Sequence, residues 1–75
     1  MGIPFPMAIE IEKTESHNGH RIRVTATQER ERAWYWHYVI DGEVAGKCKR
    51  PLPNQDEAMR QGLGAARARV DELEG

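Results

Sequence analysis

Residues Asn54 to Leu73 read NQDEAMRQGLGAARARVDEL, and this stretch decides the fold. Asn54 is a favourable N-cap residue, and Glu57 stands at the capping-box position three residues later. Apolar residues then recur at steps of four and three, which is typical of one side of a helix: Met59, Leu63, Ala66, Val70 and Leu73. A helix with one apolar stripe must bury it, so we expect this helix to pack on a β-sheet formed by the preceding residues.

Two glycines stand inside the predicted helix, where each costs about 1 kcal/mol relative to alanine. Gly62 borders the apolar stripe, which indicates a close approach to the sheet. Gly64 lies away from the stripe, and the sequence offers no strong reason for it.

A first hairpin is predicted by Asn18-Gly19, because a type I′ turn needs positive φ at both central residues. Alternating apolar residues predict strands over 7–12 and 21–27 on either side of the turn. A two-residue turn places Ile11 opposite Ala26, in a register that gathers the apolar side chains on one face. The predicted face contains Ile9, Ile11, Ile22, Val24 and Ala26.

A second hairpin is predicted around Asp41-Gly42, after a solvated connection over 28–32. Its strands cover 33–40 and roughly 43–49, and the second strand is stopped by Pro51 and Pro53.

The length of the second turn decides which side chains are buried. A two-residue turn groups Tyr35, His37, Val39, Val44 and Cys48 on one face. A three-residue loop with a glycine bulge instead groups Trp34, Trp36, Tyr38, Val44 and Cys48. We favour the three-residue loop, because it buries both tryptophans and large aromatic side chains contribute most to burial.

These elements predict one α+β domain over residues 1–75, with the order ββββα. Residues 1–6 form an extended lead-in, 7–50 a four-stranded antiparallel β-meander, and 54–73 a C-terminal helix packed on one face of the sheet.

The C-terminal half of the chain resembles the YegP-like domains of unknown function. The matching residues are Trp34, Trp36, Asp41-Gly42-Glu43, Val44, Ala58 and Gly62-Leu63. The resemblance implies a small sheet-plus-helix fold and no particular activity. The chain departs from that family at Cys48-Lys49-Arg50-Pro51, where the family usually has serine. More loosely, it resembles HicB-like antitoxins and the arm-type DNA-binding domains of integrases.

Composition restricts the classes of function. The 11 Lys and Arg against 12 Asp and Glu leave a net charge of −1, whereas general nucleic-acid binders carry a clear basic excess. Cys48 is the only cysteine, which excludes an internal disulfide and favours a reducing compartment. No apolar run has the length of a membrane span, and no signal-peptide pattern is present. We therefore expect a cytoplasmic protein without membrane contact.

No pattern typical of an enzyme is present, such as a Gly-rich phosphate loop or a Ser-His-Asp arrangement. His37 and Cys48 point to opposite faces in the favoured register, so a base–nucleophile pair is not expected. His17 and His20 flank the first turn, but structural zinc normally takes four protein ligands. A domain this small also leaves little room for a substrate pocket. We predict no catalytic activity, metal, cofactor or small-molecule substrate.

The face of the sheet away from the helix carries the candidate binding residues. They are basic and aromatic: Arg21, Arg23, Tyr35, His37 and Lys47, with Lys49 and Arg50 close by. Such side chains can stack on bases and neutralise phosphates, although Glu10 and Glu12 share this face. Tyr35 and Val39, with any tryptophan left unburied, would form a patch of the kind that binds proteins.

The leading hypothesis is therefore a small non-enzymatic protein-binding or regulatory module, either an adaptor or an inhibitor-like accessory protein. Self-association into a homodimer, through this face or a sheet edge, is one form of that hypothesis. The alternative is a nucleic-acid-binding module that uses the basic and aromatic residues of the same face.

Overall fold

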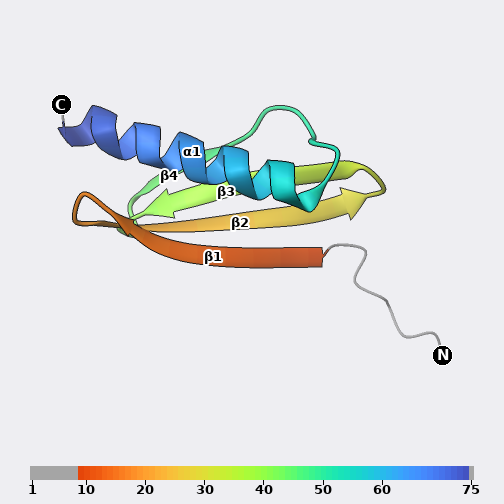
Figure 1. The fold of residues 1–75 in the computed structure, drawn as a ribbon, viewed down its shortest axis with the longest axis horizontal. Coiled ribbons are helices and arrows are strands. Elements are labelled where there is room, and N and C mark those ends of the chain that lie inside the picture. Colours follow the sequence, from red (N-terminus) through yellow and green to blue (C-terminus); the bar gives the residue numbers. More distant parts are fainter. Residues whose placement is uncertain (1–8, 75) are drawn as a thin grey trace.

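Four strands form one antiparallel sheet in chain order, and one helix packs on one side of it (Figure 1). This computed structural model describes residues 9–74. The elements are β1 (Ile9–His17), β2 (His20–Arg30), β3 (Ala33–Ile40), β4 (Val44–Lys47) and α1 (Gln55–Glu74). The predicted ββββα architecture is confirmed. The lead-in over 1–6 and the first two residues of the predicted first strand lie outside the described residues.

The first hairpin has the predicted turn and register. Asn18 and Gly19 both have positive φ, 52° and 81°, and Ile11 pairs with Ala26. Both strands are longer than the apolar pattern predicts, because backbone pairing continues through polar residues to His17.

The connection between the two predicted hairpins is much shorter than the predicted 28–32. Residues 28–30 belong to β2, so only Glu31 and Arg32 join it to β3, with Arg32 at a φ of 61°. The polar side chains of this segment indicated a loop. However, the backbone pairs with β3 whatever those side chains are, with a bulge between Gln28 and Arg30.

The second hairpin has the favoured three-residue loop, because Ile40 pairs with Val44. Asp41 and Gly42 have φ values of 53° and 72°, and the Glu43 N–H donates to the Ile40 carbonyl at 3.0 Å. The loop is thus a tight turn with positive φ at both central residues, followed by one extra residue. The predicted register is confirmed, but the extra residue is Glu43 rather than glycine.

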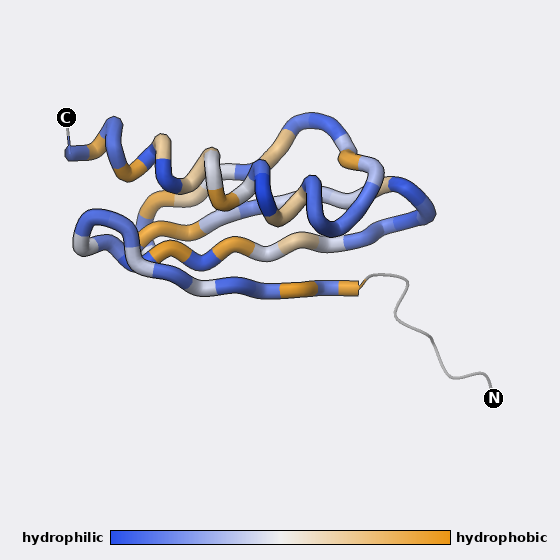
Figure 2. The backbone as a smooth tube through the Cα atoms, in the orientation of Figure 1, coloured by the Kyte–Doolittle hydropathy of each residue, from blue (hydrophilic) through white to orange (hydrophobic). Residues whose placement is uncertain are grey.

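The helix covers β2 and β3, whose apolar segments lie beneath it (Figure 2). The main core lies between the helix and these two strands. The fully packed side chains are Ile22, Val24, Tyr38, Ile40, Leu63, Ala66 and Val70. A second cluster of Ala26, Trp34 and Ala58 continues the core toward the start of the helix. Gly62 permits this contact, since a Cβ there would lie 2.7 Å from Val24 Cγ1 and 3.0 Å from Trp36 Cβ.

The helix begins as predicted, because Asn54 Oδ1 accepts a hydrogen bond of 2.9 Å from the Glu57 N–H. The prediction of burial is wrong for two residues: Ile9 is 52% exposed and Leu73 is 46% exposed. The helix lies over the central strands and leaves the edge strand β1 largely uncovered. In Figure 1 the last turn of α1 also reaches past the end of β3.

Candidate functional site

The candidate site is the open face of the sheet, which we define as the side turned away from α1. Strand alternation and the pairing register assign its residues. They are Glu10, Glu12, Thr14, Ser16, Arg21, Arg23, Thr25, Thr27, Tyr35, His37, Val39, Ala45 and Lys47. Nothing in residues 9–74 packs over this face, whereas α1 covers β2 and β3 on the other.

The open face is polarised from one edge of the sheet to the other. One cross-strand row runs from Glu12 on β1, through Thr25 and His37, to Lys47 on β4. Thr25 is only 6% exposed, because it stands in the middle of this row between longer side chains. Arg23 Nε lies 3.6 Å from Glu12 Oε2, so one of the predicted cations already has an acidic neighbour.

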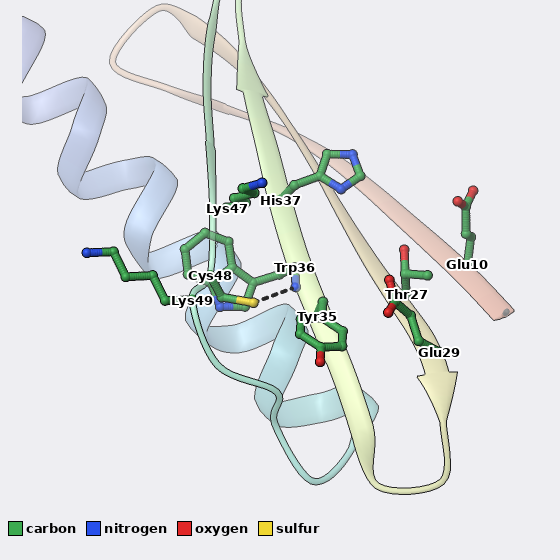
Figure 3. Close-up of a pocket in the computed structure, with 9 residues that line it drawn as sticks. All are labelled: Glu10, Thr27, Glu29, Tyr35, Trp36, His37, Lys47, Cys48 and Lys49. Carbon is green, nitrogen blue, oxygen red and sulfur yellow. Dashed lines mark hydrogen bonds between the residues drawn. The ribbon is translucent and has the colours of Figure 1, made fainter.

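A hollow of about 700 Å³ opens on this face near β3 and β4 (Figure 3). Its lining residues are Glu10, Thr27, Glu29, Tyr35, Trp36, His37, Lys47, Cys48 and Lys49. This volume lies within the usual range for ligand sites, so the expectation of little room for a pocket is wrong. The hollow is nevertheless shallow, and in Figure 3 the Lys49 side chain extends away from the sheet.

Cys48 closes the hollow where the edge of the sheet becomes irregular. Its N–H donates to the Trp36 carbonyl at 3.0 Å, and its Sγ accepts the Trp36 N–H at 3.3 Å. The sulfur therefore turns back toward β3, and Cys48 lines the same hollow as His37 although their strand positions face opposite sides. Among the described hydrogen bonds none joins these two side chains, so the geometry does not make them a base–nucleophile pair.

The predicted basic and aromatic residues separate into three places. Tyr35, His37, Lys47 and Lys49 line the large hollow. Arg21 and Arg23 lie beside Val39 and Gly42, toward the second turn. Arg50 does not join the open face, because the 49–51 segment bends outward and places it near Leu52 and the helix residue Gln61.

The predicted aromatic patch lacks its tryptophan. Trp34 is 8% exposed and Trp36 is half-buried, and both lie on the helix side. Trp36 stacks on Tyr38 with ring centroids 5.9 Å apart, and its Nε1 is buried without a partner in the described structure. The larger apolar side chains of the open face are thus Tyr35 and Val39, and both are only half-exposed.

Polar contacts tie the first hairpin to the end of the helix. His20 Nδ1 lies 2.5 Å from Asp41 Oδ2, and its Nε2 lies 2.6 Å from Glu74 Oε2. The hydrogen bond to Glu74, then the one to Asp41, raises the pKa of His20 above its usual 6.5. His17 contacts Asp71 at 3.1 Å in the same way.

This cluster connects the two histidines that flank the first turn to the last turn of α1. Its sequence signal is the last turn of the helix, which is acidic and holds no basic residue to offset the helix dipole. Within 9–74, no group of three or more His, Cys, Asp or Glu side chains is arranged to hold a metal ion.

Comparisons with protein-family models, curated proteins and solved structures found no match to this chain. The resemblance to YegP-like domains therefore stays a prediction. The helix in the described part of the chain is not long and apolar enough to cross a membrane.

Proposed function

We propose that this chain is a small non-enzymatic protein-binding module, an adaptor or an inhibitor-like regulatory protein, that contacts its partner through the open face. The observation that carries the proposal is the asymmetry of the sheet. On one face α1 covers β2 and β3, and the opposite face of the same strands has no cover in the described structure.

The chemistry of the open face supports a protein partner. Tyr35 and Val39 offer half-exposed apolar area, and Arg21 and Arg23 offer guanidinium groups near them. Tyrosine and arginine contribute strongly to protein interfaces.

The charge of the open face argues against the nucleic-acid alternative. Arg21, Arg23 and Lys47 are offset by Glu10 and Glu12 on the same face. Binding to a phosphate backbone draws its free energy from counterion release, which requires an excess of cations.

Site-specific photo-crosslinking in cells tests the proposal. A benzophenone amino acid replaces Val39 on the open face, and a matched control places it at Gly64, where nothing lies within 4 Å. We expect protein adducts from position 39 and few from position 64. Equal adducts at both positions, or none at 39, would contradict the proposal.

A binding titration with a mixed-sequence oligonucleotide tests the alternative. We expect no binding at low salt. Binding that weakens steeply with salt and disappears in the R21E/R23E/K47E variant would replace the proposed function with nucleic-acid binding.

A further inference from the structure

We infer that the partner of the open face is a second copy of this chain. The two copies pack face to face and are related by a two-fold axis. The axis lies between the two sheets, is parallel to the strands and passes over the gap between β2 and β3. This inference rests on the proposed function, because it takes the open face as a protein-binding surface. It adds the identity of the partner and the geometry of the contact.

The polarised row carries the inference. Glu12 and Lys47 stand at opposite ends of one row, and Thr25 and His37 lie between them. A two-fold axis parallel to the strands exchanges the two edges of the sheet, so β1 of each copy faces β4 of the other. Glu12 then lies over the partner's Lys47, and Lys47 lies over the partner's Glu12. The face is thus complementary to itself, as a two-fold interface requires.

The same charges disfavour the other face-to-face arrangement when its axis crosses this row. An axis perpendicular to the strands would place β1 of one copy over β1 of the other, and β4 over β4. Glu12 would then face Glu12, and Lys47 would face Lys47, which is destabilising.

Both apolar and charged side chains in the middle of the face would enter the contact. With the axis between β2 and β3, Thr27 faces the partner's Tyr35, and Arg23 faces the partner's Val39. Two sheets pack about 10 Å apart with their strands nearly aligned, which leaves room for side chains of this size. Both helices then lie on the outside of the dimer.

The size of the face sets the strength to expect. Strands about 4.8 Å apart and roughly eight residues long at about 3.3 Å per residue give a footprint of roughly 500 Å². This lies below the roughly 800 Å² per partner of a standard stable complex. We therefore expect a weak dimer whose dissociation constant rises with salt.

Sedimentation equilibrium across a concentration series tests the inference with single charge reversals. E12K brings lysine over the partner's Lys47, and K47E brings glutamate over the partner's Glu12. Each change affects two symmetric contacts, so we expect each variant alone to weaken dimerisation about tenfold or more. E72K, on the exposed surface of α1, and K13E, on the helix side of β1, carry the same charge changes and should leave dimerisation unaltered.

An equimolar mixture of the E12K and K47E chains gives the sharpest readout. In a mixed dimer, Lys at position 12 faces Glu at position 47, and the unchanged Lys47 faces the unchanged Glu12. The two weakened variants should therefore form a heterodimer with close to the wild-type dissociation constant. Variants that merely fold poorly would not rescue each other in this way.

Three results would overturn the inference. The first is a constant monomer mass at all concentrations. The second is a dimer insensitive to both reversals, as edge pairing through β1 predicts. The third is failure of the mixture to recover. The mass of the adduct at position 39 separates this inference from the proposed function. Twice the chain mass supports both, adducts only with another protein retain the proposed function alone, and no adduct contradicts both.

Discussion

The two faces of the sheet are built from alternate residues of the same strands, yet different physical requirements act on them. Ile40 on the covered face is 1% exposed, whereas its neighbour Val39 on the open face is only half-buried. The covered face is held by close packing against α1. The side chains of the open face carry charge of both signs and are not packed against another element. They are therefore free to contact a partner. Stability should therefore depend on one face and association on the other.

The largest expected effect comes from truncating one neighbour on each face of β3. Ile40→Ala removes a fully buried side chain and should lower the free energy of unfolding by about 2–5 kcal/mol. Val39→Ala removes a half-exposed side chain and should cost less than about 1 kcal/mol. Urea denaturation followed by far-ultraviolet circular dichroism measures both. Equal losses for the two variants would show that something covers the open face in the free protein.

The next effect contrasts two glycines of α1. Gly64→Ala meets open space, so it should stabilise the protein by about 1 kcal/mol through helix propensity. Gly62→Ala has the same propensity gain, but its Cβ meets Val24 and Trp36, and overpacking costs about 1–3 kcal/mol. We expect opposite signs, or at least no gain at position 62, in urea denaturation. A matching gain at both positions would mean that α1 does not approach the sheet at Gly62.

Local chemistry made much of the fold predictable. Asn18-Gly19 selects its turn by backbone conformation, Asn54 caps the helix with its own side chain, and Gly62 borders an apolar stripe. Each of these signals depends on a few neighbouring residues. The second turn was predictable for a different reason, because only the three-residue loop buries both tryptophans.

Other features depend on where elements end relative to one another, and sequence pattern does not encode this. Leu73 continues the helix stripe but stays exposed in the last turn of α1, and Ile9 alternates correctly on a strand that α1 leaves largely uncovered. Arg50 follows β4 closely, yet the outward bend before Leu52 removes it from the open face.

The candidate site, like the fold, was predictable in part. The pairing register places Tyr35, His37 and Lys47 on one face, as the three-residue loop requires. The lining of the hollow was not fully predictable, because Cys48 lines it from a strand position that faces the helix side, where its Sγ accepts the Trp36 N–H. The contacts of His17 and His20 were missed because they join segments more than 50 residues apart in sequence.

The smallest expected effect lies at the polar rim of the covered face, where His20 joins the first hairpin to the end of α1. Both ring nitrogens contact carboxylates, of Asp41 and Glu74, and only the protonated ring can donate to both. The pKa of His20 is therefore raised in the folded state. Its contribution to stability is fully present below pH 6.5, the usual value, and is lost as the pH rises through the folded-state pKa.

Asp41 sets the lower end of the pH range in which these contacts stabilise the protein. The Arg21 N–H, and then His20, lower its pKa below the usual 3.8. Its contribution is present above that value and is lost as the pH falls through the folded-state pKa. The two contributions coexist between about pH 4 and 6.5. We therefore expect the urea midpoint of the wild-type protein to be higher at pH 6 than at pH 9.

The variant His20→Gln isolates the contribution of this side chain from every other group that titrates in the same range. Glutamine keeps a polar side chain but carries no charge at either pH, so the difference in midpoint between pH 6 and pH 9 should shrink. Ile40→Ala should keep that difference, because it weakens the core and leaves the rim contacts in place. An unchanged difference in His20→Gln would show that these contacts do not hold the helix end, and that packing of the covered face alone positions it.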